Sequence, residues 1–360
     1  MPHILPADPA RRSDAISIAR VLCILGVVYV HAWTGRNGVD LEAMRGSPQE
    51  IFRWILMEAL GRSAVPLLGL ISGWLVMASA RTRDWRDHVA RKARTIAVPM
   101  VLWNGIAILL VSGAALYGRL EAPVPQSWEW VAQELFVLTR NPDINVQMPF
   151  LRDLFLCMVA APLFVRLPSP LLLAVAALAG ACHIAGLGPP VLMRASILCF
   201  FLLGMVARRA GTADRAAALP FWIAALPYAL LMPLRLAIAL HVGREPGHEL
   251  VAAVDLLARV AAALLFWRLA WFLALRPAGG ALLRIEPYAF FLFCAHLIVI
   301  WLAGPLVGQL VGPLGSPLYP LYLLLQPMLI LIPVVAFATL LRRTSAPIAN
   351  LLSGGRLGRR

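Results

Sequence analysis

Long apolar runs separated by short polar gaps follow one another along the whole chain. A run of about 18 or more mostly apolar residues is typical of a helix that crosses a membrane. The pattern therefore predicts an all-α fold, a polytopic transmembrane bundle of about ten helices. The predicted helices occupy residues 15–33, 53–79, 95–117, 149–165, 170–187, 192–208, 220–241, 250–275, 286–310 and 319–341.

The polar gaps between these runs are too short to hold a soluble domain. We therefore expect one integral-membrane domain over residues 1–360, with flexible cytoplasmic tails at 1–13 and 343–360. The longest gap, 118–148, carries two tryptophans beside a short amphipathic stretch, which is typical of a helix at the membrane surface. The start of the second run is open, because a helix that begins near Ala64 would leave residues 53–62 as an interfacial segment.

Composition and charge support a multi-pass membrane protein. The chain is 61% hydrophobic with a mean hydropathy of +0.79, whereas soluble domains are nearer half apolar. The net charge of +14 comes from 32 basic residues, all of them arginines except Lys92. The arginines gather in every second gap, which is the pattern of cytoplasmic loops. Both chain ends are therefore predicted on the cytoplasmic side, and the basic balance does not indicate nucleic-acid binding.

The first run carries two ionisable residues, Arg20 and His31, with ten mostly apolar residues between them. Eleven positions at about 100° each bring both side chains to one helix face, about 16 Å apart along the axis. An ionisable side chain inside a span costs at least about 2.5 kcal/mol and therefore indicates function. Because imidazole titrates near neutral pH, His31 is a candidate to take a proton from a hydroxyl, with a packing or interfacial role as the alternative.

Further ionisable residues lie within or beside the runs. Two pairs have the i,i+4 spacing at which opposite charges neutralise each other on one helix face. These pairs are Glu58 with Arg62 and Asp255 with Arg259. Structural pairing is favoured over function for Asp255, whereas Arg152 and Asp153 fit either role, because neighbouring residues face different ways. The five cysteines have no paired spacing and no cluster has metal-ligand spacing, so no metal site is predicted.

Several blocks, taken in order, resemble the acyltransferase-3 family of integral-membrane proteins, which O-acylate bacterial surface and exported polysaccharides. Arg20 and His31 match the arginine, ten residues and histidine of the family's first helix. Residues 65–75 resemble its next helix block and are followed by a basic loop that ends at Pro99. Residues 148–155 and 293–296 resemble two later blocks. The resemblance covers about residues 13 to 300.

The resemblance implies transfer of an acyl group, most often acetyl, from cytoplasmic acyl-CoA such as acetyl-CoA to a sugar hydroxyl. The acceptor would be an exopolysaccharide or its lipid-linked precursor. His31 would act as the general base or carry the acyl group, and Arg20 would orient the donor or stabilise negative charge. Residues of the basic loop would hold the phosphates of acyl-CoA, namely Arg86, Arg91, Lys92 and Arg94. The acceptor pocket would include Glu58, Arg62, Ser72, Arg152, Asp153 and His296.

The same resemblance implies a multi-pass protein of the bacterial cytoplasmic (inner) membrane. Its expected partners are acyl-CoA, the saccharide acceptor, membrane lipid and other polysaccharide-synthesis proteins, and acyl-CoA is a co-substrate rather than a resident cofactor. Two other classes of function remain open. One is a transporter or flippase of a lipid-linked sugar, whose intramembrane charges would line a path. The other is a non-catalytic partner in a polysaccharide-synthesis complex. The basic loop also fits a purely topological role.

Overall fold

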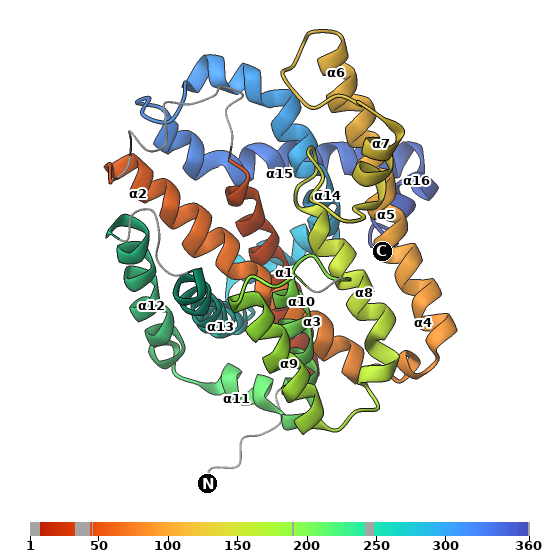
Figure 1. The fold of residues 1–360 in the computed structure, drawn as a ribbon, viewed down its shortest axis with the longest axis vertical. Coiled ribbons are helices and arrows are strands. Elements are labelled where there is room, and N and C mark those ends of the chain that lie inside the picture. Colours follow the sequence, from red (N-terminus) through yellow and green to blue (C-terminus); the bar gives the residue numbers. More distant parts are fainter. Residues whose placement is uncertain (1–7, 33–43, 45, 189–190, 242–247, 359–360) are drawn as a thin grey trace. The chain divides into compact units, whose positions relative to one another are not determined.

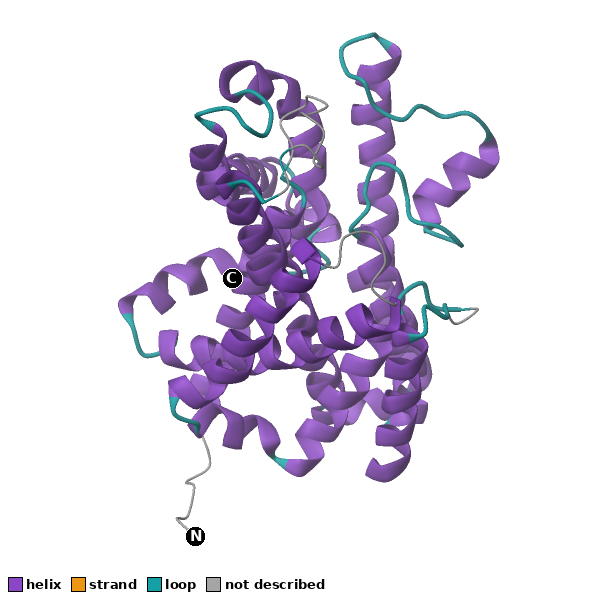
Figure 2. Cartoon of the chain, turned by 60° about the vertical axis from the view of Figure 1, so that its left-hand side comes forward, coloured by secondary structure: helices purple, strands orange, loops and turns teal. Residues whose placement is uncertain are grey.

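The computed structural model describes residues 8–32, 44, 46–188, 191–241 and 248–358. Every regular element in these ranges is a helix, which confirms the all-α prediction (Figures 1 and 2). Trp33, predicted within the first span, lies outside the described residues.

The described helices are connected by segments of unequal length (Figure 1). Labels beginning with η mark π-helical or 3-10 segments, and most of these continue a neighbouring α-helix. The elements are α1 (Pro9–Val30), α2 (Pro48–Trp54), η1 (Ile55–Arg62), α3 (Ser63–Ala78), η2 (Ala80–Arg83), α4 (Trp85–Lys92), η3 (Ala93–Ala97), α5 (Val98–Ala107), η4 (Ile108–Ser112), α6 (Gly113–Leu116), α7 (Trp128–Phe136), α8 (Met148–Phe164), α9 (Ser169–Ile184), α10 (Ala195–Ala210), α11 (Thr212–Ala218), α12 (Phe221–His241), α13 (His248–Leu273), α14 (Pro277–Val311), α15 (Tyr319–Thr344) and α16 (Ala346–Leu352).

Seven helical stretches among the described residues are long and apolar enough to cross a membrane. They are Pro9–Val30, Pro48–Ala78, Trp85–Leu116, Phe221–Ile238, Glu249–Leu273, Pro277–Val311 and Tyr319–Thr344. An eighth is present if α10 and α11, which meet at 84°, form one bent span. The predicted spans at 149–165 and 170–187 correspond to α8 and α9, which have 17 and 16 residues and are shorter than a typical span. The count of ten therefore stays a prediction.

Two π-helical segments precede prolines inside spans. The second candidate span is one continuous helical stretch from Pro48 to Ala78, so residues 53–62 and the run that starts near Ala64 form a single helix. Its η1 segment ends at Arg62, four residues before the buried Pro66, and η3 likewise contains Thr95, four residues before Pro99. Proline has no N–H to donate and clashes with the carbonyl four residues earlier. A local widening of the helix is a known way to accommodate this conflict.

The chain forms two compact units, each assembled from three stretches of sequence. Unit 1 contains the described parts of 1–23, 63–91 and 153–286, and unit 2 contains those of 24–62, 92–152 and 287–360. Helices α1, α8 and α14 each contribute residues to both units.

Unit 1 is built around the contact of α3 with α10. A Cβ placed on Gly73 would lie 1.8 Å from the carbonyl oxygen of Phe201, and one on Gly204 would lie 2.0 Å from that of Leu70. The two glycines therefore let the helix backbones touch, as small residues commonly do between membrane helices.

Unit 2 has a core at the start of α15. The core consists of Leu56, Leu314, Tyr319, Tyr322 and Leu323, and Tyr29 and Ala32 from the end of the first span pack against it.

The predicted tails are partly helical and partly buried. Helix α1 begins at Pro9, so residues 9–13 are helical. At the other end, residues 346–352 form α16, and Leu357 beyond it is only 2% exposed. Arg356 donates a hydrogen bond to the Thr95 carbonyl (3.2 Å), and the central carbon of its guanidinium group lies 3.9 Å from the centre of the Phe290 ring. Within the predicted tail, short apolar stretches of residues 346–357 pack on unit 2.

Candidate functional site

Two histidines from distant parts of the sequence meet in unit 2. Helix α1 ends at Val30, and His31 occupies the turn that follows. The backbone N–H of His31 donates a hydrogen bond to the Val28 carbonyl (3.3 Å). The half-buried His31 ring lies 5.3 Å, centre to centre, from the ring of His296 on α14, and the two planes are tilted by 42°. His296 is fully buried. The sequence indicated both residues but did not predict their contact.

The hydrogen bonds of His296 define which of its nitrogens carries a proton. Its Nδ1 lies 2.8 Å from the carbonyl oxygen of Phe293 and 3.2 Å from that of Leu292. Because carbonyl oxygens only accept, Nδ1 must be the donor, and in the neutral ring Nε2 is then the acceptor. Nε2 is buried and has no hydrogen-bond partner. An unsatisfied buried acceptor costs about 1–3 kcal/mol, so this nitrogen is suited to receive a donor from a substrate.

Two buried amides in unit 2 show the same kind of unsatisfied group. Gln326 on α15 is 0% exposed, and neither of its side-chain polar atoms has a hydrogen-bond partner. Gln326 follows Tyr322 by one helical turn, so it lies on the face of α15 that packs near Tyr29 at the end of α1. Gln147 donates to the Cys294 carbonyl (3.5 Å), while its Oε1 has no partner. The sequence pattern did not single out either amide, although Gln326 lies within an apolar run, and a glutamine there is itself a signal.

Arg20 has an acidic partner in unit 1. Its Nη1 lies 3.6 Å from Oε1 of Glu286 on α14, and the two side chains are 38% and 30% exposed. Ion pairs of this exposure contribute little to stability. The Arg20–Glu286 and His31–His296 contacts belong to different units, yet both join α1 to α14.

The basic segment of α4 and η3 contains residues with different surroundings. Arg86 and Arg94 are exposed. Arg91 forms an ion pair with Asp87 (3.0 Å) and donates to the Arg81 carbonyl (3.3 Å). Lys92 is half-buried. Arg86 and Arg94 are therefore the two guanidiniums of the predicted set that remain most accessible to an anion.

The other predicted acceptor residues are distributed over both units. Glu58 and Arg62 form the expected i,i+4 ion pair at 3.2 Å in unit 2. Asp153 is fully buried in unit 1, where it accepts the backbone N–H groups of Met193 (3.2 Å) and Arg194 (2.8 Å) at the start of α10. These residues therefore have partners within the protein, and their place in an acceptor pocket stays a prediction.

Arg152 and Ser72 complete that predicted set. Arg152, in unit 2, donates to the Leu138 carbonyl (2.9 Å). Ser72 is half-buried on α3 in unit 1. Neither is placed beside the histidine pair by a described contact.

Asp255 has the structural role that its spacing favoured. It binds Arg259 one turn along α13 and also Arg235 of α12 (2.6 Å), so the carboxylate links two helices. Within the described ranges, no group of three His, Cys, Asp or Glu side chains is arranged to hold a metal ion.

Comparison with known proteins gives the family context. A model described as an acyltransferase domain, that of the acyltransferase-3 family, matches residues 13–342. The chain is also similar to the succinoglycan biosynthesis protein ExoH of Rhizobium meliloti (strain 1021), with 28% identity over 371 residues that cover 97% of this chain and 94% of the relative. No solved structure matches.

Proposed function

Because the chain belongs to the acyltransferase-3 family, we propose that it transfers an acyl group from cytoplasmic acyl-CoA to a sugar hydroxyl of an exopolysaccharide or its lipid-linked precursor. The proposed donor is acetyl-CoA. The name of the relative, a succinoglycan biosynthesis protein, supports a polysaccharide acceptor. Its bacterial source and the apolar spans support a multi-pass protein of the bacterial cytoplasmic membrane.

The contact of His31 with His296 is the observation that carries this proposal. His31 takes the proton of the acceptor hydroxyl while the oxygen attacks the thioester carbonyl carbon. The carbon–sulfur bond then breaks, and the CoA thiolate leaves with the proton that His31 held. A sugar ester and CoA thiol are the products. In the alternative form, His31 carries the acyl group covalently before the hydroxyl attacks.

His296 is the positioning residue in this scheme. Its bare Nε2 accepts a hydrogen bond from a sugar hydroxyl and so orients the acceptor beside His31. The unpaired amide of Gln326 has the donors and the acceptor that a second hydroxyl requires.

Cationic side chains bind and orient the acyl donor, acyl-CoA. Arg86 and Arg94 are exposed and bind the CoA phosphates, for which guanidinium groups are well suited. Arg20 orients the thioester or stabilises the negative charge that develops on its oxygen.

Replacement of His31 tests the proposal directly. The purified full-length His31→Ala variant should release CoA thiol from acetyl-CoA in the presence of saccharide at least about 100-fold more slowly than the parent, because a general base typically contributes 100-fold or more. His183→Ala on α9, in unit 1, is the matched control and should retain activity. Normal activity in a folded His31→Ala variant would refute the role of His31.

A deletion strain separates acyl transfer from transport. Loss of the acyl decoration with continued export of the polymer supports the enzyme. Loss of export altogether would instead support a transporter or flippase, or a non-catalytic partner of the synthesis machinery.

A further inference from the structure

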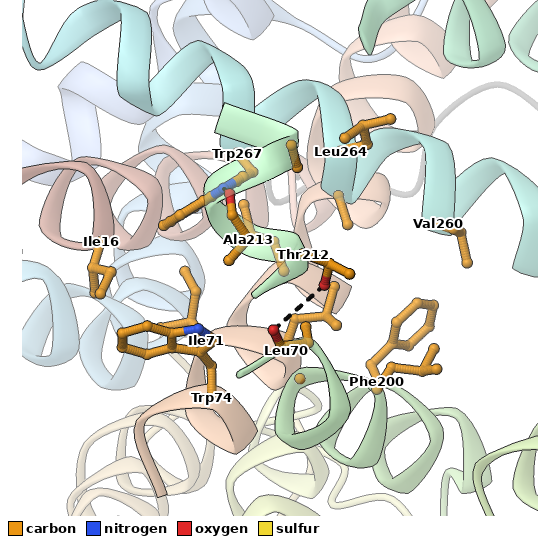
Figure 3. Close-up of a pocket in the computed structure, with 16 residues that line it drawn as sticks. Ile16, Leu70, Ile71, Trp74, Phe200, Thr212, Ala213, Val260, Leu264 and Trp267 are labelled. Carbon is orange, nitrogen blue, oxygen red and sulfur yellow. Dashed lines mark hydrogen bonds between the residues drawn. The ribbon is translucent and has the colours of Figure 1, made fainter. Parts of the chain in front are cut away.

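Unit 1 contains a cavity of about 300 Å³ with an almost wholly apolar lining (Figure 3). Leu70 and Trp74 of α3, Phe200 of α10 and Val260 and Trp267 of α13 form its walls. An apolar cavity of about 150 Å³ stays dry and binds hydrocarbon in a well-studied engineered case. A cavity of this size and lining therefore favours an apolar occupant over water.

The few polar groups in the lining are already bonded to the backbone. The Thr212 hydroxyl donates to the Ala207 carbonyl (3.4 Å), a bond drawn dashed in Figure 3. The indole N–H of Trp267 donates to the Ala213 carbonyl (2.9 Å). The pantetheine arm of CoA carries amides that would lose their hydrogen bonds to water here, so the cavity does not suit the acyl donor.

The fold keeps the cavity open at the junction of α10 and α11. Gly211 lies between these helices with φ +63°, a left-handed conformation that glycine adopts without strain, and the chain bends there by 84°. The bend brings Thr212, Ala213 and Ala216 of α11 to one side of the cavity.

Positive charge surrounds the end of the cavity at Trp74. The Arg208 guanidinium lies 4.4 Å from the centre of the Trp74 ring, and that of Arg12 lies 5.8 Å from it. Arg12 forms an ion pair with Asp214 (3.0 Å). In the described part of the chain, Arg208 has no carboxylate within ion-pair distance. The sequence also predicts this arginine-rich end on the cytoplasmic side.

We propose that this cavity binds one acyl tail of an anionic phospholipid from the cytoplasmic leaflet, with the lipid phosphate against Arg208. The apolar walls take the tail, and the guanidinium forms charge-assisted hydrogen bonds to the phosphate. Anionic lipid is preferred over zwitterionic lipid because Arg12 is paired with Asp214, whereas the guanidinium of Arg208 adds a positive charge at this end of the cavity.

Fluorescence quenching by lipids with brominated tails tests this proposal. The delipidated full-length protein in detergent is titrated with brominated phosphatidylglycerol or, in parallel, brominated phosphatidylcholine. Phosphatidylglycerol should quench saturably and at about fivefold lower concentration than phosphatidylcholine. The chain has 11 tryptophans, and several of them can be quenched by lipid. The quenching that arises in the cavity is therefore the part that is lost in the Trp74→Phe and Trp267→Phe variants.

Two further variants separate the head-group site from the tail site. Arg208→Gln should abolish the preference for phosphatidylglycerol, whereas Arg284→Gln, which removes an exposed arginine of α14 elsewhere in unit 1, should not. Ala263→Phe, or the milder Ala213→Leu, fills the cavity and should remove saturable quenching by both lipids. Saturable quenching that persists in the filled variants would overturn the tail assignment. An unchanged preference in Arg208→Gln would overturn the head-group assignment.

Discussion

His296 has one ring nitrogen bonded to the backbone and the other buried without a partner. The bonds of Nδ1 hold the ring in one tautomer and one orientation, so Nε2 needs no rearrangement before it accepts a hydroxyl. Preorganisation of this kind lowers the cost of binding and of reaching the transition state. In the proposed acceptor site, the orientation of His296 is thus set by backbone carbonyls of α14 rather than by another ionisable side chain.

Replacement of His296 by phenylalanine should weaken acceptor binding more than catalysis. His296→Phe keeps a ring of similar size but removes Nε2, so the KM for the saccharide should rise about tenfold while the KM for acyl-CoA stays unchanged. Steady-state kinetics with each substrate varied in turn measure the split. Equal changes in both KM values would indicate a general structural defect instead.

Glu134 is a buried carboxyl outside the candidate spans. It accepts hydrogen bonds from the backbone N–H groups of Asp143 (2.5 Å) and Ile144 (3.2 Å). These bonds fix the position of the loop after α7. Burial raises the pKa of Glu134, and its two backbone hydrogen bonds only partly oppose this effect. The folded loop therefore favours the protonated form of the Glu134 carboxyl more than the unfolded chain does. Its stabilising contribution is complete at low pH and is lost as the pH rises through the raised pKa.

Amide hydrogen exchange tests this pH dependence. In the parent, protection of the loop at 139–145, corrected for intrinsic exchange, should fall as the pH rises above the ordinary glutamate pKa of about 4.3. The Glu134→Gln variant cannot ionise at this position and should lack that fall. Equal pH dependence in the two proteins would contradict the assignment to Glu134.

At the scale of elements, the contact of α3 with α10 depends on the absence of side chains at two positions. Gly73 lies against the Phe201 backbone and Gly204 against that of Leu70. The same two helices also contribute walls of the cavity, so their close approach defines its shape.

A single methyl group at this contact should destabilise the protein. Gly73→Ala places a Cβ 1.8 Å from a carbonyl oxygen and should cost about 1–3 kcal/mol through overpacking, seen as a lower midpoint of thermal unfolding. Gly280→Ala in α14, where nothing lies within 4 Å of the added Cβ, is the matched control. It should be neutral or slightly stabilising, because alanine favours helix more than glycine does. A lower midpoint in the control alone would argue against overpacking.

Long apolar runs predicted which segments form the membrane helices. A helix that crosses a membrane needs such a run, and the local sequence shows it directly. Contacts between segments were not predictable in the same way. His31 and His296 carry no local sign of their partnership, and the structural bonds of Asp153 depend on the backbone at the start of α10. Residues 346–357 resembled a tail because their apolar stretches are too short to span a membrane, and only packing against unit 2 reveals their role.

At the scale of the whole molecule, the acyltransferase chain is divided into two units that share helices. Residues of α1 up to Cys23 belong to unit 1, whereas His31 belongs to unit 2, and α14 passes from unit 1 to unit 2 after Glu286. The two candidate catalytic residues, Arg20 on α1 and His31 in the turn after it, are therefore connected through a helix that is continuous up to Val30. Any shift of this helix along its axis would act on both side chains.

The interleaving of the two units limits how the chain can be divided. Each unit draws on the beginning, middle and later part of the sequence. No single cut in the gene would release either half as a fragment containing all of its own helices. Recombination between relatives would have to exchange several segments together, so we expect viable chimaeras to be rare unless their crossovers fall at the unit borders, which lie within α1, α4, α8 and α14 and between η1 and α3.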